Sequence, residues 1–192
     1  MKLAYHYSDS PLRVARLKFL NKFNFKETDI PRMAFATPYS LLTWSSLEDL
    51  NQRLDTPVSE INFRANLVIE SDENIPYIED RWRKRLRYAH CLANDSNIIL
   101  VKCITIIRLQ YFYIHTRIGD EVILRYAKPC HRCMVTQVDP KTGKLYEKGE
   151  PMRTLKKYRM TEPELNGPIF AVQFGIEVCG TAKIGDIVYE EI

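Results

Sequence analysis

The clearest periodic pattern of apolar residues lies between residues 44 and 54, WSSLEDLNQRL. Its leucines recur at spacings of three and four residues, at Leu47, Leu50 and Leu54. Residues at this spacing lie on one face of an α-helix. Ser45 and Glu48 stand at the spacing of a capping box, in which both side chains bind free backbone N–H groups at the helix start. The pattern therefore predicts a helix over this stretch that packs through its leucine face.

Shorter runs of β-branched and aromatic residues, bounded by turn residues, predict strands along much of the remaining chain. Residues 30–43 are interpreted as a loop that leads into a first strand. Further strands are predicted at 61–70, 120–127, 133–138, 169–174 and 184–190. Phe63, Leu67 and Ile69 are candidate core residues of the 61–70 strand. Many short strands, frequent turns and few helices are typical of a β-rich barrel or sandwich.

Residues 85–116 do not follow this pattern of short strands separated by turns. A basic cluster, within residues 81–87, precedes a nearly unbroken run of β-branched and aromatic residues from Ile98 to Ile114. Polar residues interrupt the run, so that it makes a poor transmembrane helix. The simplest interpretation is a pair of buried strands, because the same sequence would promote aggregation if it were exposed.

Composition indicates one soluble globular domain with a core of ordinary size. The chain has 192 residues, of which 45% are hydrophobic and 27% are charged. A net charge of +4 permits an anionic ligand but does not indicate a nucleic-acid-binding protein. Residues 1–19 contain no apolar stretch of signal-peptide or membrane length, although their basic composition leaves a transit peptide open. Five cysteines without a signal peptide indicate reduced thiols in an intracellular compartment.

Two of the cysteines, Cys130 and Cys133, stand three residues apart in the stretch PCHRCMVTQVDPKTG. A structural zinc site needs four ligands, and the sequence has no second pair at knuckle spacing. A thioredoxin-type dithiol needs a helix after the pair, which the β-branched residues that follow disfavour. Burial of both thiols in a core is the ordinary alternative. The basic neighbours Lys128, His131 and Arg132 favour instead a thiolate, which binds soft metals or attacks electrophiles.

Arg64 and Asn66 form a second candidate pair, because residues two apart on a strand project from the same side. On a soluble domain such a pair usually belongs to a solvated face. Guanidinium and amide donors also suit a phosphate group, so that the pair is a candidate anion site. The motifs of serine hydrolases, zinc proteases, P-loop proteins and dinucleotide-binding proteins are absent from the sequence.

Six stretches of the chain are similar to the MOSC domain, the C-terminal module of molybdenum cofactor sulfurases. They are ATPYSLLTWSSLEDLNQRL (36–54), NFRANLVI (62–69), IEDRW (78–82), RIGDEVILRYAKPCHRCMVTQVDPKTG (117–143), GEPMRTLKKYR (149–159) and FG…GTAKIGDIV (174–188). Within that superfamily the chain most resembles the mitochondrial amidoxime-reducing component. The run C-x-R-C-x-x-T-x-V-D-P-x-T-G followed by E-P-x-x-T-L-x-x-Y-R is long and distinctive. The resemblance implies a β-rich α+β fold, with a MOSC-type β-barrel core and a few short helices.

The resemblance also implies which residues hold a molybdenum–molybdopterin cofactor. Cys133 matches the thiolate ligand of molybdenum, which makes it both the metal ligand and the catalytic residue. Arg64 and Asn66 match positions that hold the pterin phosphate region, and Cys130 would lie behind the metal ligand. The implied cofactor-binding residues besides Cys133 are Thr37, Arg64, Asn66, Cys130 and Arg132.

The reaction of that family is the reduction of N-hydroxylated compounds such as amidoximes, in which molybdenum accepts the oxygen. A cytochrome b5-type haem protein and its reductase supply the electrons. The family is placed at the mitochondrial outer membrane, although this chain shows no membrane anchor or clear targeting signal. The resemblance therefore implies a molybdenum-dependent oxidoreductase with such an electron donor as its partner.

Two departures from the family pattern generate further expectations. Residues 1–29 look like the remnant of a missing N-terminal β-rich half, and residues 30–192 make up the MOSC domain. Joining Arg83-Lys84 directly to Arg117 would restore the family pattern. Residues 85–116 are therefore predicted to be an insertion, such as a translated intron. We expect this insertion to pack poorly against the core or to protrude from it.

Two alternative functions stay open from the sequence. A truncated chain could be a catalytically silent MOSC fragment that does not retain the cofactor. It could also be a sulfur carrier related to molybdenum cofactor sulfurases. Their activity depends on a separate pyridoxal-phosphate domain that this chain lacks. Pyridoxal phosphate is therefore an association of the wider family only.

Overall fold

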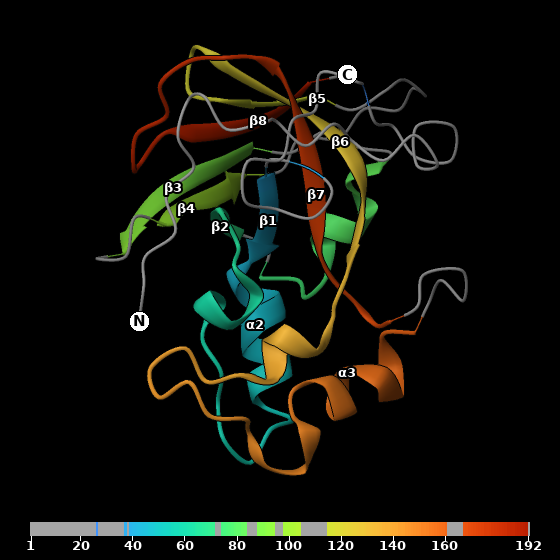
Figure 1. Cartoon of the computed structure of the whole chain (residues 1–192). Coiled ribbons are helices and arrows are strands. Elements are labelled where there is room, and N and C mark those ends of the chain that lie inside the picture. The colour runs from blue at the N-terminus through green and yellow to red at the C-terminus, as the bar shows by residue number, and fades with distance from the viewer. Residues whose placement is uncertain are drawn as a thin grey trace, which may run out of the picture.

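A closed barrel organises the residues that the computed structural model describes, which are residues 26 and 37 and residues 39–71, 74–83, 88–94, 98–104, 115–160 and 167–191. Its strands are β1 (Tyr39–Thr43), β2 (Leu67–Ser71), β3 (Tyr88–Asn94), β4 (Ile98–Ile104), β5 (His115–Ile118), β6 (Val122–His131), β7 (Ile169–Val178) and β8 (Ile187–Glu191). They follow the order β1-β2-β4-β3-β8-β5-β6-β7, and β7 closes on β1. The helices α2 (Trp44–Asn51) and α3 (Met152–Tyr158) lie below the barrel in Figure 1. This arrangement confirms the predicted β-rich α+β fold with a barrel core.

β1 lies between β2 and β7 and sets the frame of the candidate site. It pairs with β2 in parallel, because the intervening chain crosses over through α2. It pairs with β7 in antiparallel fashion, with Ser40 opposite Gln173. β6 continues the sheet on the other side of β7, with Lys128 opposite Gln173 and with irregular register on both sides of Pro129. These pairings bring the start of β1, the middle of β7 and the end of β6 side by side.

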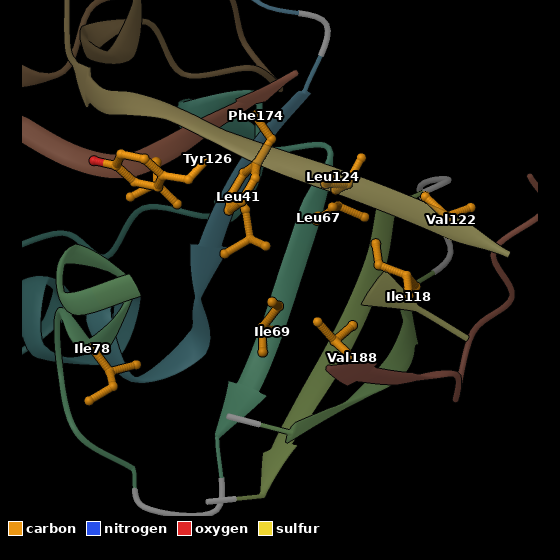
Figure 2. Packing of buried hydrophobic residues seen from close by; sticks show 11 residues of the cluster. Leu41, Leu67, Ile69, Ile78, Ile118, Val122, Leu124, Tyr126, Phe174 and Val188 are labelled. Atoms are coloured by element: carbon orange, nitrogen blue, oxygen red, sulfur yellow. The ribbon is translucent and has the colours of Figure 1, made fainter. Parts of the chain in front are cut away.

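The first hydrophobic cluster fills the inside of the barrel. Val172 and Phe174 of β7 point inward, so that Gln173 between them lies on the outer face, as the two-residue period of a strand requires. The inward-pointing side chains converge between the strands in Figure 2. The buried members are Leu41, Leu67, Ile69, Ile78, Ile118, Val122, Leu124, Tyr126, Val172, Phe174 and Val188. Apolar burial is the main favourable term in folding, and here it leaves the barrel filled.

A second hydrophobic cluster lies between the outer face of the barrel and the two helices. Leu42 of β1 and Val68 of β2 point outward into it, because each stands next to an inward-facing residue. The helices contribute Leu47 and Leu50 from α2 and Leu155 from α3. The remaining buried members are Val58, Phe63, Ala65, Cys130, Phe170 and Ala171. The candidate core residues Phe63, Leu67 and Ile69 are thus all buried, but Phe63 belongs to this outer cluster.

The predicted helix at 44–54 is confirmed over Trp44–Asn51, and its leucine face is buried. Its predicted capping box is wrong, because the residue before the first turn is Thr43 and no side chain caps the helix start. Glu48 instead accepts a hydrogen bond from Trp44 Nε1 at 2.9 Å. Ser45 Oγ donates to the carbonyl of Ile75 at 3.0 Å. A tertiary contact therefore takes the hydroxyl that the local motif would have used.

Four of the strand predictions are confirmed. The first strand, β1, follows the predicted loop. The strands predicted at 120–127, 169–174 and 184–190 lie mostly within β6, β7 and β8, respectively. The strand predicted at 61–70 is wrong in its first half, where a 3₁₀ helix, η1 (Glu60–Phe63), precedes β2. The strand predicted at 133–138 is wrong, because the 3₁₀ helix η3 (Met134–Gln137) stands there. β-branched residues favour a strand only where it can pack in a sheet, and in both places the chain leaves the sheet.

Residues 88–94 and 98–104, inside the predicted insertion, form strands of the barrel. β4 pairs in parallel with β2, and β3 pairs with β8. The expectation that this segment protrudes is therefore wrong for the backbone of these two strands. Their side chains lie outside what the structure describes, and so do residues 84–87 and 105–114 and, apart from Lys26, residues 1–36. The insertion and the N-terminal remnant stay predictions.

A buried arginine at the end of α3 ties the helices to the sheet. Arg159 Nε donates to the carbonyl of Ile169 at 2.9 Å, and its Nη2 donates to Asp80 Oδ2 at 2.6 Å. The guanidinium carbon lies 4.1 Å from the centroid of the Tyr77 ring. Tyr77 in turn donates to Asp49 Oδ2 of α2 at 2.6 Å. Arg159 therefore joins β7, α3 and, through Tyr77, α2.

Glu79, in the 3₁₀ helix η2 (Ile78–Arg83), is 0% exposed. Thr43 Oγ1 and Ser46 Oγ donate to its Oε2 at 2.8 and 2.9 Å. Its Oε1 has no hydrogen-bond partner among the described residues. Burial raises the pKa of this carboxyl to about 7, with a smaller contribution from the negative charge of Asp80. The site therefore suits the protonated form of Glu79 better than the charged form.

Replacing Glu79 by Gln should change how stability depends on pH. The unfolded chain releases this proton near the usual 4.5 and the folded chain only near 7, so that the contribution of Glu79 to stability falls as the pH rises through that interval. Glutamine keeps an acceptor oxygen for Thr43 and Ser46 but has no charge. Between about pH 5 and about pH 8, the Glu79→Gln variant should therefore gain about 1–3 kcal/mol relative to the wild type. Urea unfolding across that range measures this gain, and a difference that stays constant with pH would contradict it.

Candidate functional site

Cys133 presents an exposed thiol just beyond the end of β6. Its backbone is extended, with φ −113° and ψ 177°, and the 3₁₀ helix η3 begins at the next residue. The carbonyl oxygen of Cys133 accepts hydrogen bonds from Thr136 N at 3.2 Å and from Thr136 Oγ1 at 3.0 Å. These two bonds fix the backbone from which the thiol projects. The exposed side chains of Met134 and Val135 follow directly.

Arg132, the residue before the thiol, is 7% exposed and is held by backbone carbonyls. Its Nε donates to the carbonyl of Phe170 at 2.6 Å, and its Nη1 donates to the carbonyl of Phe63 at 2.7 Å. The guanidinium carbon lies 5.4 Å from the centroid of the Phe63 ring. The third nitrogen, Nη2, is buried and has no hydrogen-bond partner among the described residues.

Gly167 allows the chain to approach Arg132 closely. The backbone N–H of Arg132 donates to the carbonyl of Pro168 at 2.8 Å. A Cβ at position 167 would lie 2.6 Å from the carbonyl oxygen of Arg132, which is too close for any side chain. Because the neighbour is backbone, it cannot move aside, and this position therefore needs glycine.

Arg64 lies in a left-handed turn, with φ 51° and ψ 39°. Ser40 Oγ donates to the carbonyl of Arg64 at 3.1 Å, and Ser40 N donates to Asn66 Oδ1 at 2.9 Å. Asn66 N donates to the carbonyl of Ser40 at 2.9 Å. Arg64 and Asn66 are therefore held together, both exposed, against the start of β1. The prediction that they project from one side of a strand is wrong, because the strand begins only at Leu67.

Asn62 brings the Arg64 turn next to the segment that carries Cys133. The Asn62 side chain is buried in η1, and its Nδ2 donates to the carbonyl of Val138 at 3.2 Å and to Tyr146 Oη at 3.4 Å. Together with the bond from Arg132 to Phe63, this contact joins η1 to η3. The structure therefore brings Arg64, Asn66, Arg132 and Cys133 into one region.

Lys128 and His131 add positive charge and a basic ring beside this region. Lys128 is 1% exposed, and its Nζ lies 3.1 Å from His131 Nδ1. Burial, together with the smaller effect of the positive charges of Lys128 and Arg132, lowers the pKa of His131 to about 4. His131 is therefore neutral at pH 7 and accepts a hydrogen bond from the lysine. The sequence indicated these neighbours of the thiol but not their contact.

Ser40 and Gln173 are contacts of the site that the sequence did not indicate. The register of the sheet places Ser40 opposite Gln173, and Gln173 opposite Lys128. Gln173 Oε1 is buried and has no partner among the described residues. A row across three strands leaves no signal in the sequence, because its members lie far apart along the chain.

Thr37 and Cys130 lie apart from the exposed thiol. Thr37 is buried two residues before β1, and its hydroxyl donates to the carbonyl of Tyr39 at 3.2 Å. Cys130 packs in the second hydrophobic cluster, and its Sγ lies 3.9 Å from the carbonyl oxygen of His131. Both Cys130 and Cys133 are free thiols. Their roles toward a cofactor, like those of Arg64, Asn66 and Arg132, stay predictions.

The described side chains do not form a metal site by themselves. Within the part of the chain that the structure describes, no three His, Cys, Asp or Glu residues gather in a way that could hold a metal ion. A metal bound by Cys133 would therefore take its other ligands from a cofactor or another source. None of the described helices is long and apolar enough to span a membrane.

Comparison with known protein families matches the MOSC domain to residues 5–189, and the chain therefore belongs to the MOSC domain family. The resemblance inferred from its sequence motifs is thus confirmed. The chain is similar to mitochondrial amidoxime-reducing component 1 of Mus musculus and of Homo sapiens. Each of them is 35% identical over 170 residues, which cover 86% of this chain and 40% of the relative.

A further relative extends this similarity over nearly the whole chain. Mitochondrial amidoxime-reducing component 1 of Xenopus laevis is 29% identical over 189 residues, which cover 96% of this chain and 45% of the relative. Mitochondrial amidoxime reducing component 2 of Rattus norvegicus is 30% identical over 161 residues, or 81% of this chain and 37% of the relative. The chain thus spans less than half the length of these curated relatives.

The left-handed turn at Arg64 predicts an unusual response to glycine. A residue with a Cβ is strained at φ 51°, whereas glycine adopts this region freely. The Arg64→Gly variant should therefore be more stable than the Arg64→Ala variant by about 0.5–1 kcal/mol, although glycine elsewhere costs stability. Both variants lack the guanidinium, so that the pair isolates the backbone. Urea unfolding measures the difference, and a less stable glycine variant would show that the turn is not left-handed.

Proposed function

We propose that this chain is the cofactor-binding domain of a molybdenum-dependent reductase of N-hydroxylated compounds, such as amidoximes. The observation that carries the proposal is the exposed thiol of Cys133, which directly follows a buried arginine with one unpartnered guanidinium nitrogen. Membership of the MOSC family and the printed names of the relatives support the cofactor and the class of reaction.

The residues at the site fit a group that brings its own sulfur ligands and negative charge. A molybdenum–molybdopterin cofactor contains dithiolene sulfurs and a phosphate, so that the protein needs to add one soft thiolate and several donors. Cys133 offers that thiolate from an exposed position. Nη2 of Arg132 is a buried donor that an anionic or carbonyl group would satisfy.

Arg64 and Asn66 would hold the phosphate region of the cofactor. The N–H of Ser40 donates to the side chain of Asn66, which identifies the bonded atom as the amide oxygen. The amide nitrogen of Asn66 then points its N–H groups away from that bond, as a donor for an anion. Arg64 adds a guanidinium that can bind two phosphate oxygens at once. In this proposal Thr37 and Cys130 support the site from buried positions.

When bound, the molybdenum cofactor supplies the two-electron chemistry that removes oxygen from the substrate. The residues of this chain bind and orient the cofactor. His131, at the end of β6, stays neutral at pH 7 because its pKa is lowered to about 4. We extend the proposal to a cytochrome b5-type electron donor with its reductase as partners. The relatives are named as mitochondrial components, which supports a mitochondrial location, and we extend the proposal to the outer membrane.

Removal of the thiol tests the proposal directly. The full chain is produced together with cofactor biosynthesis, and the molybdenum content of the purified protein is measured by mass spectrometry. Cys133→Ala should reduce the molybdenum content to background, because the metal loses its protein ligand. Cys130→Ala is the matched control, since it removes a thiol that is buried in the second cluster and should keep most of the metal. Equal molybdenum in the wild type and in Cys133→Ala would contradict the proposal.

Removal of the Arg64 guanidinium tests the phosphate contact. Arg64→Ala loses a charge-assisted hydrogen bond worth about 1.5–3 kcal/mol, so that cofactor affinity should fall by roughly tenfold to a hundredfold. Arg53→Ala serves as the control, because Arg53 is another exposed arginine, just after α2, whose ion pair is with Asp49 of that helix. Cofactor content after dialysis measures the loss. If Arg64→Ala loses stability but keeps its cofactor, the residue has only a structural role.

A further inference from the structure

Arg132 binds two other segments of the chain, the start of β7 and the end of η1, near Cys133. Its backbone N–H donates to the carbonyl of Pro168, its Nε to that of Phe170 and its Nη1 to that of Phe63. We infer that Arg132 is a positioning residue, which holds the Cys133 thiol and the turn at Arg64 in a fixed relation to each other. This role is distinct from a contact with the cofactor, because it is made through bonds within the protein.

The bond from Arg132 to Phe63 determines the backbone of Arg64. The carbonyl of Phe63 belongs to the peptide plane on the N-terminal side of Arg64, and Arg132 Nη1 binds it at 2.7 Å. In the same plane, the N–H of Arg64 donates to the carbonyl of Ile61 at 3.0 Å. The peptide plane on the C-terminal side is held by Ser40 Oγ, which donates to the carbonyl of Arg64. With both planes fixed, the residue between them is confined to its left-handed conformation.

The backbone of Cys133 is fixed in the same manner. On its N-terminal side stands Arg132, which is anchored through its backbone and its side chain. On its C-terminal side Thr136 binds the carbonyl of Cys133 through both N and Oγ1. The guanidinium therefore connects the backbone that carries the thiol with the backbone that carries the Arg64 side chain, alongside the bond from Asn62 to Val138.

An arginine suits this position for a geometric reason. The planar guanidinium directs Nε and Nη1 at two carbonyls that belong to residues 38 and 69 positions away in the sequence. It also lies against the ring of Phe63, which packs on Phe170 with a centroid distance of 4.3 Å. A lysine would keep the charge, but its single nitrogen lacks the rigid fork that spans two acceptors.

Arg159 provides a matched control for this inference. It is buried to a similar degree, donates to the carbonyl of Ile169 on the same strand β7 and also stacks on an aromatic ring, that of Tyr77. Its bonds run to Ile169 and Asp80 and not to the segments of Arg64 or Cys133. Replacing Arg159 therefore removes a comparable buried guanidinium and leaves the connection between those segments in place.

The test compares Arg132→Lys and Arg132→Met with Arg159→Lys and Arg159→Met in the full chain. The first measurement is amide hydrogen exchange at Arg64 and Asn66, whose N–H groups bind Ile61 and Ser40. The second is the electron paramagnetic resonance spectrum of a nitroxide attached to Cys133, from which the spectrum of labelled Cys133→Ser is subtracted. Neither measurement requires the cofactor, so that the outcome is independent of the proposed function.

Both Arg132 variants should exchange the Arg64 and Asn66 amides about tenfold faster or more, as expected for the loss of a hydrogen bond from a charged donor. The nitroxide at Cys133 should become more mobile in the same variants. The Arg159 variants should lose global stability without either local change. If Arg132→Met does not fold, the comparison of Arg132→Lys with Arg159→Lys decides the question.

Two results would overturn the inference. If the Arg132 and Arg159 variants give the same exchange rates and the same nitroxide spectra, Arg132 contributes to stability only. If Arg132→Lys restores both measurements to wild-type values, the charge is sufficient and the fork has no positioning role. A protein that shows the expected local changes but binds no molybdenum would retain the positioning role and contradict only the proposed function.

Discussion

The contact between the rings of Phe63 and Phe170, whose centroids lie 4.3 Å apart, is the interaction on which the arrangement of the site depends. It joins the 3₁₀ helix η1 to β7 on the outer face of the barrel. The carbonyls of the same two residues accept both hydrogen bonds of the Arg132 guanidinium. Apolar packing and charged hydrogen bonding therefore act at the same pair of residues, so that weakening one exposes the other to water.

The candidate site lies outside the barrel interior. Among the described residues, the buried side chains of the first cluster pack together between the strands. β6 and β7 extend far enough to carry Cys133 toward the helices, and Figure 1 shows both strands running down to that end. Outward-facing Gln173, opposite Ser40 on β1 and the buried Lys128 on β6, adds polar groups to this outer face. The fold thus separates an apolar core, which stabilises the barrel, from the outer region that carries the exposed Cys133 thiol.

The sequence predicted those parts of the fold that depend on local periodicity. The leucine spacing of 44–54 reports directly which side of the helix is buried. The predictions at 61–70 and 133–138 failed because the β-branched residues Ile61 and Val135 lie in 3₁₀ helices, which distant partners hold in place. Asn62, for example, is fixed by the carbonyl of Val138, 76 positions away. Only the three-dimensional structure reveals such a bond.

For the candidate site too, the sequence indicated the residue types and their local spacing but not their contacts with distant residues. Family resemblance assigned Cys133, Arg64, Asn66 and Arg132 to a cofactor site, since motifs preserve residue type and spacing, and those roles stay predictions. It did not reveal that backbone carbonyls hold Arg132, because a carbonyl acceptor is common to every residue type. The hydrogen bonds of Ser40 to Arg64 and Asn66 were missed for a related reason, because the register of β1 and β2 creates them.

Four buried polar atoms of the described residues have no hydrogen-bond partner, and two of them belong to the candidate site; the other two are Oε1 of Glu79 and Oγ1 of Thr116. A buried polar atom without a hydrogen bond costs about 1–3 kcal/mol, so that folded proteins keep few of them. Glu79 lowers this cost by protonation, because its pKa is raised to about 7. A change of protonation cannot lower this cost for Nη2 of Arg132 or for Oε1 of Gln173, because a guanidinium keeps its charge and an amide does not titrate. Both belong to residues on or directly after β6 and β7, one a donor and the other an acceptor. A ligand with acceptors as well as N–H groups, as a pterin has, would satisfy both, and this chemistry favours the outer face beside Cys133 as its place.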